Sequence, residues 1–160
     1  HDIEGIYRLG SNPKVMQYIT GRTQTRKEAK ADLARRMKTA RLPLGYWIVE
    51  TMDTQDFVGW MALKQLDQTK DIEIGYRFVE EQWGRGFATE ASLRVLKYGF
   101  EVVGLERIVA VALAVNSRSL RVMEKIGLKY EKKGRYYGYD CVFYALSKLD
   151  YEKESTSSTI

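Results

Sequence analysis

The stretch that decides the fold is "EEQWGRGFATEA", residues 80–91, in which two glycines flank Arg85 directly before a run that predicts the start of a helix. Upstream, "DIEIGYRFV" (71–79) alternates apolar and polar residues and predicts a strand. Downstream, small and apolar residues recur at helical spacing over 88–100, which predicts a helix ending near Gly104. The order is a strand, a glycine-rich basic turn and a helix. Such a turn suits phosphate, because the first N–H groups of a helix have no acceptors and carry partial positive charge.

The remaining pattern predicts a mixed α/β (α+β) fold, with a mostly antiparallel central sheet flanked by helices. Asn12 and Pro13 predict a short helix, and Thr25 with Glu28 forms a capping-box pattern that opens a longer one. The other expected elements are a helix over 25–38, a strand pair over 46–66, a strand over 107–115, a helix over 116–127 closed by Gly127, and a last strand pair over 128–149.

Length and composition limit the classes of protein and site that are admissible. A chain of 160 residues, 44% of them hydrophobic, suits one domain with one core, and we expect that domain to span residues 1–150. The tail over 151–160 has little to bury, so we expect it to be disordered. Cys141 is the single cysteine and His1 the single histidine, so we expect neither an internal disulfide nor a metal site.

Charge and apolar runs bear on partners and location. The net charge of +5 suits nucleic acid, a membrane surface or a small anionic ligand. The basic residues are spread along the chain without a nucleic-acid-binding signature, so we expect no nucleic-acid partner. The longest apolar run, residues 108–115, is too short to span a bilayer, and no signal-peptide layout opens the chain, so we expect no membrane partner. The expected protein is cytoplasmic, and a monomer or a homodimer.

Two common phosphate-binding loops do not fit the glycine turn. A P-loop needs Gly-Lys-Ser/Thr, and a dinucleotide fingerprint needs a third glycine or alanine where this chain has Thr89. The preceding strand also stands in an antiparallel context, which argues against a Rossmann crossover. A turn that holds pyrophosphate after a splayed strand remains, and so does a plain helix start without a ligand.

Two separated segments resemble the GNAT acetyltransferase superfamily, in its ribosomal-protein N-acetyltransferase-like (RimJ/RimL-like) branch. They are "EIGYRFVEEQWGRGFATEA" (73–91) and "LERIVAVALAVNSRSLRVMEKIGLKYEKKG" (105–134), and the resemblance extends over residues 11–149. It implies the GNAT acyl-CoA N-acyltransferase fold and transfer of acetyl from acetyl-CoA to a primary amine by direct attack in a ternary complex. Members of this branch open with a strand, whereas residues 1–9 have helical spacing, so we expect the first strand to be missing.

The resemblance also implies a cofactor-binding set. The pyrophosphate of acetyl-CoA would lie on N–H groups of the turn and of the first helical turn, and the pantetheine amides would pair with the preceding strand end and with Asn116. The implied residues are Phe78, Val79, Gly84, Arg85, Gly86, Phe87, Ala88, Thr89, Asn116 and Ser119. The general GNAT pattern has Gln or Arg where this chain has Trp83, which we expect to serve in packing rather than in binding.

Acetyl transfer needs a neutral amine, which suggests a general base. A terminal α-amine with a pKa of about 8 is partly neutral in the cell, whereas a lysine amine with a pKa of about 10.4 is neutral only at the level of roughly one in a thousand. Glu73 is the candidate base, because it lies on the strand that leads to the turn and alternation puts it on the face opposite Ile72 and Ile74. An ordinary solvent-facing strand glutamate would fit the same pattern.

The departing thiolate needs a proton, and the usual tyrosine of the family is replaced here by Met123, whose thioether has none to give. Ser119 lies four residues earlier on the same helical face and is the candidate acid, although a helix serine often bonds only to its own backbone. The missing tyrosine leaves open a non-catalytic CoA-binding or sensing module. Tyr136, Tyr137 and Tyr139 could line the acceptor site, but tyrosines are common in turns and strands, so they stay outside the set.

Overall fold

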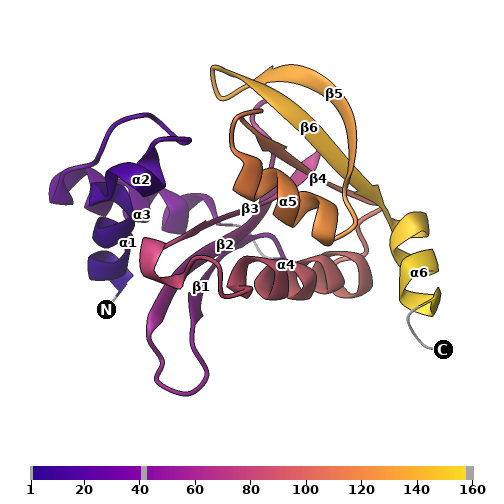
Figure 1. Cartoon of the computed structure of the whole chain (residues 1–160), viewed down its shortest axis with the longest axis horizontal. Helices are drawn as coiled ribbons and strands as arrows, with labels where there is room; N and C mark the ends of the chain where they lie inside the picture. Colours follow the sequence, from indigo (N-terminus) through magenta and orange to yellow (C-terminus); the bar gives the residue numbers. More distant parts are fainter. Residues whose placement is uncertain (1, 41–42, 158–160) are drawn as a thin grey trace. The chain divides into compact units, whose positions relative to one another are not determined.

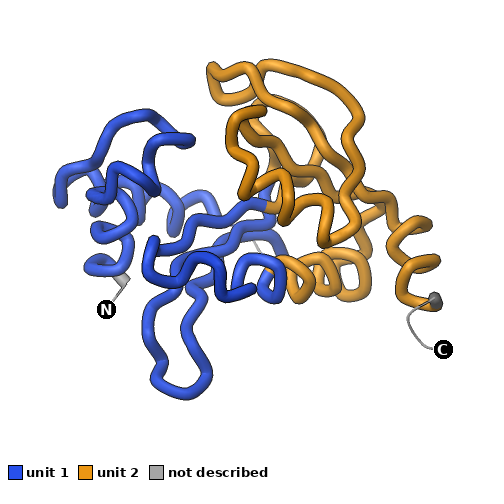
Figure 2. Tube along the Cα trace, in the orientation of Figure 1, with its two compact units in different colours: residues 1–64, 75–91 blue, residues 65–74, 92–160 orange. Residues whose placement is uncertain are grey.

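The computed structural model describes residues 2–40 and 43–157 (Figure 1). Six strands form one hydrogen-bonded sheet in the order β1-β2-β3-β4-β6-β5. Helices precede, connect and follow these strands along the chain. The β1–β2, β4–β6 and β5–β6 ladders are antiparallel, and the β3–β4 ladder is parallel. This is the mixed, mostly antiparallel α/β fold that the sequence predicts. The chain clusters into two compact units, residues 1–64 with 75–91 and residues 65–74 with 92–160 (Figure 2).

The first unit opens with three helices. They are α1 (Asp2–Ser11), α2 (Pro13–Met16) and α3 (Arg26–Thr39). Asn12 caps α2 by accepting from the N–H of Lys14 at 2.9 Å, and Thr25 with Glu28 forms the predicted capping box on α3. Within the described residues no strand precedes these helices, as residues 1–9 predict, and β1 (Gly45–Glu50) is an edge strand of the sheet.

The antiparallel hairpin of β1 and β2 (Phe57–Gln65) builds the core of the first unit. Its inward side chains form one apolar cluster with α1, α2 and α3, which contains Ile6, Leu9, Val15, Ala29, Trp60, Ala62 and Val79. Gly59 is required where β2 runs against the following strand, because a Cβ there would lie 2.1 Å from the carbonyl oxygen of Arg77. The unit ends with the short 3₁₀ turn Glu80–Gln82 and the start of α4 (Phe87–Lys97).

The second unit is built around β4 (Arg107–Ala112) and the long hairpin of β5 (Lys129–Tyr136) and β6 (Tyr139–Ser147). Glu73, on β3 (Ile72–Phe78), faces Val109 across the parallel ladder. The helix α5 (Ser117–Lys125) has Ile126 as its C-cap, and Gly127, which the sequence predicts to close the helix, follows directly with a φ of 90°. Beyond α4 the chain makes a π-helical turn over Tyr98–Val102, and Gly104, at a φ of 77°, ends the helix where the sequence predicts.

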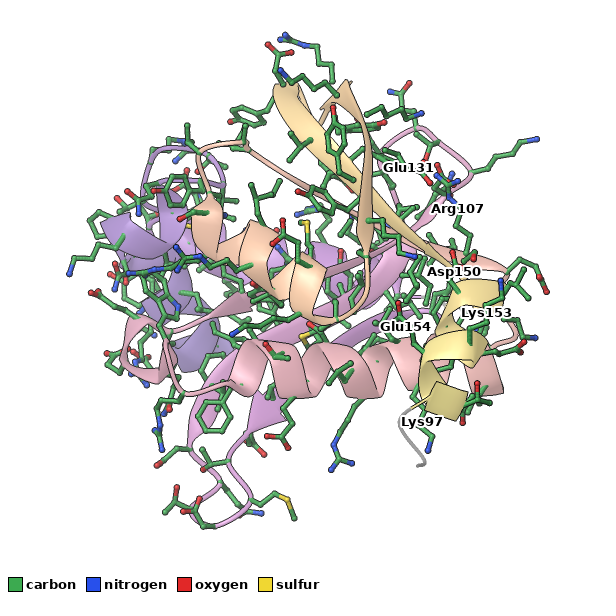
Figure 3. All side chains as sticks on the ribbon, turned by 45° about the vertical axis from the view of Figure 1, so that its right-hand side comes forward. Lys97, Arg107, Glu131, Asp150, Lys153 and Glu154 are labelled. Carbon is green, nitrogen blue, oxygen red and sulfur yellow. The ribbon has the colours of Figure 1, made fainter. Side chains whose placement is uncertain are left out.

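The expectation of a disordered tail from residue 151 is wrong as far as Ser157, because Lys148–Ser157 forms the helix α6. The Tyr151 ring stacks on Phe100 at 4.7 Å between centroids, and its hydroxyl donates to Glu101 at 2.8 Å. Figure 3 shows charged side chains of α4, β4, β5 and α6 gathered around this helix, and among them Arg107 pairs with Glu131 at 2.8 Å. The part of the expected tail over 158–160 lies outside the described residues, and the single domain over 1–150 stays a prediction.

Candidate functional site

The turn Gly84–Gly86 is exposed and runs directly into α4. Gly84 has a φ of 72° and Gly86 a φ of 84°, a region that L side chains rarely adopt, and a Cβ added at either glycine would meet nothing within 4 Å. The glycines are therefore explained by backbone conformation and not by crowding from the protein. The open space beside them leaves the backbone accessible to a ligand.

The start of α4 presents free backbone donors. The first intrahelical bond runs from the N–H of Glu90 to the carbonyl of Gly86 at 3.0 Å, so the N–H groups of Phe87, Ala88 and Thr89 come before it and have no acceptor within the helix. The guanidinium of Arg85 lies over the Phe87 ring at 5.0 Å and donates to Gln82 at 2.5 Å. Donors, helix dipole and one cation therefore lie at the same turn, an arrangement suited to an anion such as pyrophosphate.

The strand end before the turn is partly occupied by the protein itself. The N–H of Val79 donates to the carbonyl of Val58 at 2.9 Å, and the carbonyl of Val79 accepts from the N–H of Gln82 at 3.0 Å. The carbonyl of Phe78 accepts from the indole N–H of Trp83 at 2.9 Å. Each of the two carbonyls has two lone pairs, and these protein contacts take one of them.

Trp83 has two roles, one of which the sequence predicts. Its ring packs against the apolar cluster of the first unit, as expected of a residue that serves in packing. Its indole also donates the hydrogen bond to Phe78, which fixes the turn to the end of β3. An aromatic side chain at this position thus holds the glycine turn in place without contributing charge.

Glu73 is buried, not solvent-facing. Its side chain keeps 6% of its accessible surface, and the hydroxyl of Tyr137 donates a hydrogen bond to its Oε1. A carboxylate in such a place is costly unless donors compensate for lost water. The reading of Glu73 as an ordinary exposed strand residue is therefore wrong, and the structure brings Glu73 together with Tyr137, which the sequence analysis left out of the site.

Asn116 and Ser119 lie at the start of α5. The Oδ1 of Asn116 accepts from the N–H of Ser119 at 3.3 Å, which makes Asn116 the N-cap of this helix. Among the described residues the hydroxyl of Ser119 has no hydrogen-bond partner, so it is not engaged by its own backbone. Met123, where the family tyrosine would stand, is 5% exposed and packs in the interior.

The candidate residues therefore form two groups. The strand end, turn and helix start over 78–89 belong to the first unit, and Glu73, Asn116 and Ser119 belong to the second. Sequence reasoning missed the part that Asp67 and Tyr137 play around Glu73. The only signal for it was the Tyr-Gly pair at 137–138 between two strands, a turn position that usually holds Asn, Asp or Gly.

The side chains and helices of the structure also bear on metal ligation and membrane insertion. In the part of the chain that the structure describes, no group of three or more His, Cys, Asp or Glu side chains could hold a metal ion. None of the helices over residues 2–40 and 43–157 combines the length and the apolar character needed to cross a membrane.

Comparisons with known proteins bear on the family. The sequence matches the model of the acetyltransferase (GNAT) domain over residues 1–129. The uncharacterized protein YkkB of Bacillus subtilis (strain 168) is 32% identical over 126 residues, which are 78% of this chain and 73% of YkkB. The crystal structure of a GNAT-family acetyltransferase from Bacillus anthracis superposes with a TM-score of 0.80 at 27% identity, over 92% of this chain and 90% of that one.

A third similarity shows the fold alone. A spermidine N-acetyltransferase from Vibrio cholerae, solved in complex with CoA and spermine, superposes with a TM-score of 0.76 at 19% identity. The match covers 94% of this chain and 92% of that one.

Proposed function

We propose, since the chain belongs to the acetyltransferase (GNAT) family, that it moves the acetyl group of acetyl-CoA to a primary amine. The observation that carries the proposal is the exposed turn Gly84–Gly86, which opens α4 with two left-handed glycines and three N–H groups lacking a helical acceptor. A cosubstrate with a pyrophosphate matches that turn in charge and in donor pattern. The V. cholerae neighbour, which carries CoA in its crystal, has the same fold and supports the choice of cosubstrate.

Each group of candidate residues has its own proposed role toward the cosubstrate. The N–H groups of Gly84 to Thr89 hold the pyrophosphate, and Arg85 adds charge. The carbonyls of Phe78 and Val79, at the end of β3, accept from the pantetheine amides beside the hydrogen bonds that they already make. Asn116 and Ser119 act toward the thiol end of the cosubstrate. Within the described residues no metal ligand group accompanies this set, and the proposed chemistry uses none.

Two side chains carry the proton transfers of the proposed reaction. The neutral amine attacks the thioester carbonyl, so that a C–N bond forms and the C–S bond breaks. Glu73 accepts the proton that leaves the nitrogen, directly or through water, and Ser119 gives a proton to the departing thiolate. The products are the N-acetylated amine and free CoA thiol; Glu73 then releases its proton to solvent, and Ser119 regains one from solvent.

The acceptor and the branch belong to the proposal as well. We place the chain in the RimJ/RimL-like branch on its two sequence segments, which favours a protein N-terminal α-amine as acceptor. A small amine is the second candidate, since the V. cholerae neighbour is a spermidine acetyltransferase. The cytoplasmic location and the monomeric or homodimeric state remain predictions from the sequence.

Thiol release over a panel of amines tests the proposal. The purified chain is incubated with acetyl-CoA and with peptides that have free or blocked N-termini, spermidine, or no amine, and free thiol is measured over time. We expect amine-dependent release. Binding of acetyl-CoA without release on any amine would instead identify a CoA-binding or sensing module, the alternative suggested by Met123.

A further inference from the structure

Tyr137 occupies a backbone conformation that a large side chain rarely adopts. It follows β5 in the tight turn to β6, between the paired residues Tyr136 and Tyr139, with a φ of 53°, and Gly138 beside it has a φ of 84°. Two successive positive φ values are typical of the type I′ hairpin turn, whose first position favours Asn, Asp or Gly. A tyrosine there is strained relative to the right-handed region. Some interaction of Tyr137 must offset that strain.

The compensating interactions connect the turn to the loop before β3. The N–H of Tyr137 donates to Oδ2 of Asp67 at 2.8 Å, and the N–H of Asp67 donates in return to the hydroxyl oxygen of Tyr137 at 3.1 Å. Asp67 itself has a φ of 42°. Two hydrogen bonds close its loop, from the N–H of Leu66 to the carbonyl of Asp71 and from the N–H of Thr69 to the carbonyl of Leu66, both 2.9 Å long. Tyr137 is therefore bonded to a loop that has internal hydrogen bonds of its own.

The same hydroxyl donates to the buried carboxylate of Glu73. It therefore accepts one hydrogen bond from the loop and gives its only proton to Glu73, which defines its orientation. Titratable groups near this carboxylate, among the described residues, include Tyr137 from the turn and Cys141 from β6, and Asp67 from the loop contacts Tyr137. Burial, and then the negative charges of Asp140 and Glu73, raise the pKa of the Cys141 thiol, so Cys141 stays neutral at physiological pH.

The surroundings of Glu73 in this unit are otherwise largely apolar. Val109 lies opposite it on β4 and belongs, with Leu66, Tyr136, Cys141 and Phe143, to one buried cluster. A hydrogen-bond donor in such a place restricts the rotamers of a carboxylate. Tyr137 is thus suited to control the direction of the Glu73 side chain.

We propose that Tyr137 is a positioning residue of the acetyl transfer, and that its hydroxyl, held by Asp67, keeps the Glu73 carboxylate in one orientation toward the acceptor amine. Tyr137 does not give up its proton in the reaction; it acts only through Glu73. The inference rests on the proposed function, in which Glu73 is the base.

A double-mutant cycle in turnover tests this role. Tyr137→Phe keeps the ring, the turn and the N–H bond to Asp67, and removes only the hydroxyl. We expect kcat to fall about tenfold, with unchanged acetyl-CoA affinity, because Glu73 loses the donor that fixes its orientation toward the amine. In a Glu73→Gln background the same change should have little further effect. Tyr130→Phe, on the exposed face of the same hairpin, is the matched control.

The outcomes separate the inference from the function on which it rests. If Tyr137→Phe lowers kcat equally with and without Glu73, or leaves kcat as in the wild type, Tyr137 does not position Glu73. If Glu73→Gln alone has wild-type turnover at every pH, the assignment of the base is at fault. Asp67→Ala removes the acceptor of the Tyr137 N–H and gives a second route to the same test; it should reproduce the loss in kcat only when Glu73 is present.

Discussion

The backbone N–H of Glu90 donates to the carbonyl of Gly86 at 3.0 Å, which makes this the first intrahelical hydrogen bond of α4. The amides over residues 87–89 precede that bond and have no acceptor within the helix. Two of the three residues of the turn in front of them, Gly84 and Gly86, are glycines with positive φ. They have no side chains that could shield these amides. The proposed anion site is thus a consequence of where the helix begins.

Replacement of Gly86 tests the turn. Gly86→Val places a branched side chain at a φ of 84°, beside the proposed pyrophosphate, and should weaken acetyl-CoA binding by at least about tenfold, measured by isothermal titration. Gly21→Val is the control, since Gly21 also has a positive φ, 71°, and open space around its Cβ position. Both variants should lose similar stability, and only the first should lose affinity. Equal affinities in two folded variants would exclude the turn as the binding site.

Ser119 should matter for turnover more than for binding. Ser119→Ala removes the proposed proton donor to the thiolate, so kcat should fall by about one to two orders of magnitude, with the acetyl-CoA affinity nearly unchanged. Ser117→Ala, an exposed serine in the first turn of the same helix, should retain wild-type kinetics. Single-turnover thiol release measures the rate of acetyl transfer in both variants. Wild-type turnover in Ser119→Ala would remove Ser119 from the mechanism.

The Glu73 side chain should matter most at low pH. Gln is nearly isosteric and can still accept the hydrogen bond from Tyr137, so Glu73→Gln isolates the loss of the charge. Turnover should fall most where the acceptor amine is most protonated and depends most on a base. The check is a profile of kcat/KM against pH for both proteins. Profiles of the same shape and height would be incompatible with Glu73 as the base.

The fold of the first unit should depend on Asp32 in a pH-dependent way. Burial would raise the pKa of Asp32, but the charge and hydrogen bond of Arg36, at 2.9 Å, together with Arg35, outweigh burial and lower it. A lowered folded pKa stabilises the protein above the unfolded value of about 3.9, and that stability is lost as the pH falls through the folded pKa. Asp32→Asn should therefore cost about 1 kcal/mol of unfolding free energy at pH 7.

Urea unfolding at several pH values measures this difference, which should shrink below about pH 4 as the wild-type carboxylate is protonated. Asp140→Asn is the control, because the Asp140 carboxylate pairs with Arg135 only at the surface, at 3.5 Å. It should change stability little at any pH. A constant difference between wild type and Asp32→Asn down to pH 2 would show that packing, not charge, explains the effect.

Local signals in the sequence predicted much of the fold. The capping residues Asn12 and Thr25 act as their types suggest, and the glycines that end α4 and α5 have positive φ. These features are visible because each depends on residues within one helical turn of it. The strands over 45–78 follow the alternation of apolar residues for the same reason.

Features that depend on distant residues could not be predicted in this way. The sequence of α6 has no apolar stripe, and Tyr151 is held by Phe100 and Glu101, some fifty positions earlier. Alternation places Glu73 on one face of its strand but does not say that this face is covered. That information comes from Tyr137, which is 64 positions away and stands where turn statistics favour a smaller residue.

The most direct test of the central claim is a titration of ¹⁵N-labelled protein with acetyl-CoA, followed through the backbone amide signals. If the turn and the start of α4 bind the pyrophosphate, the amides over residues 84–89 should show the largest shifts, and acetyl-pantetheine, which has no pyrophosphate, should leave them in place. Saturable binding of acetyl-CoA that leaves the amides over 84–89 unmoved, or no binding at all, would contradict the account.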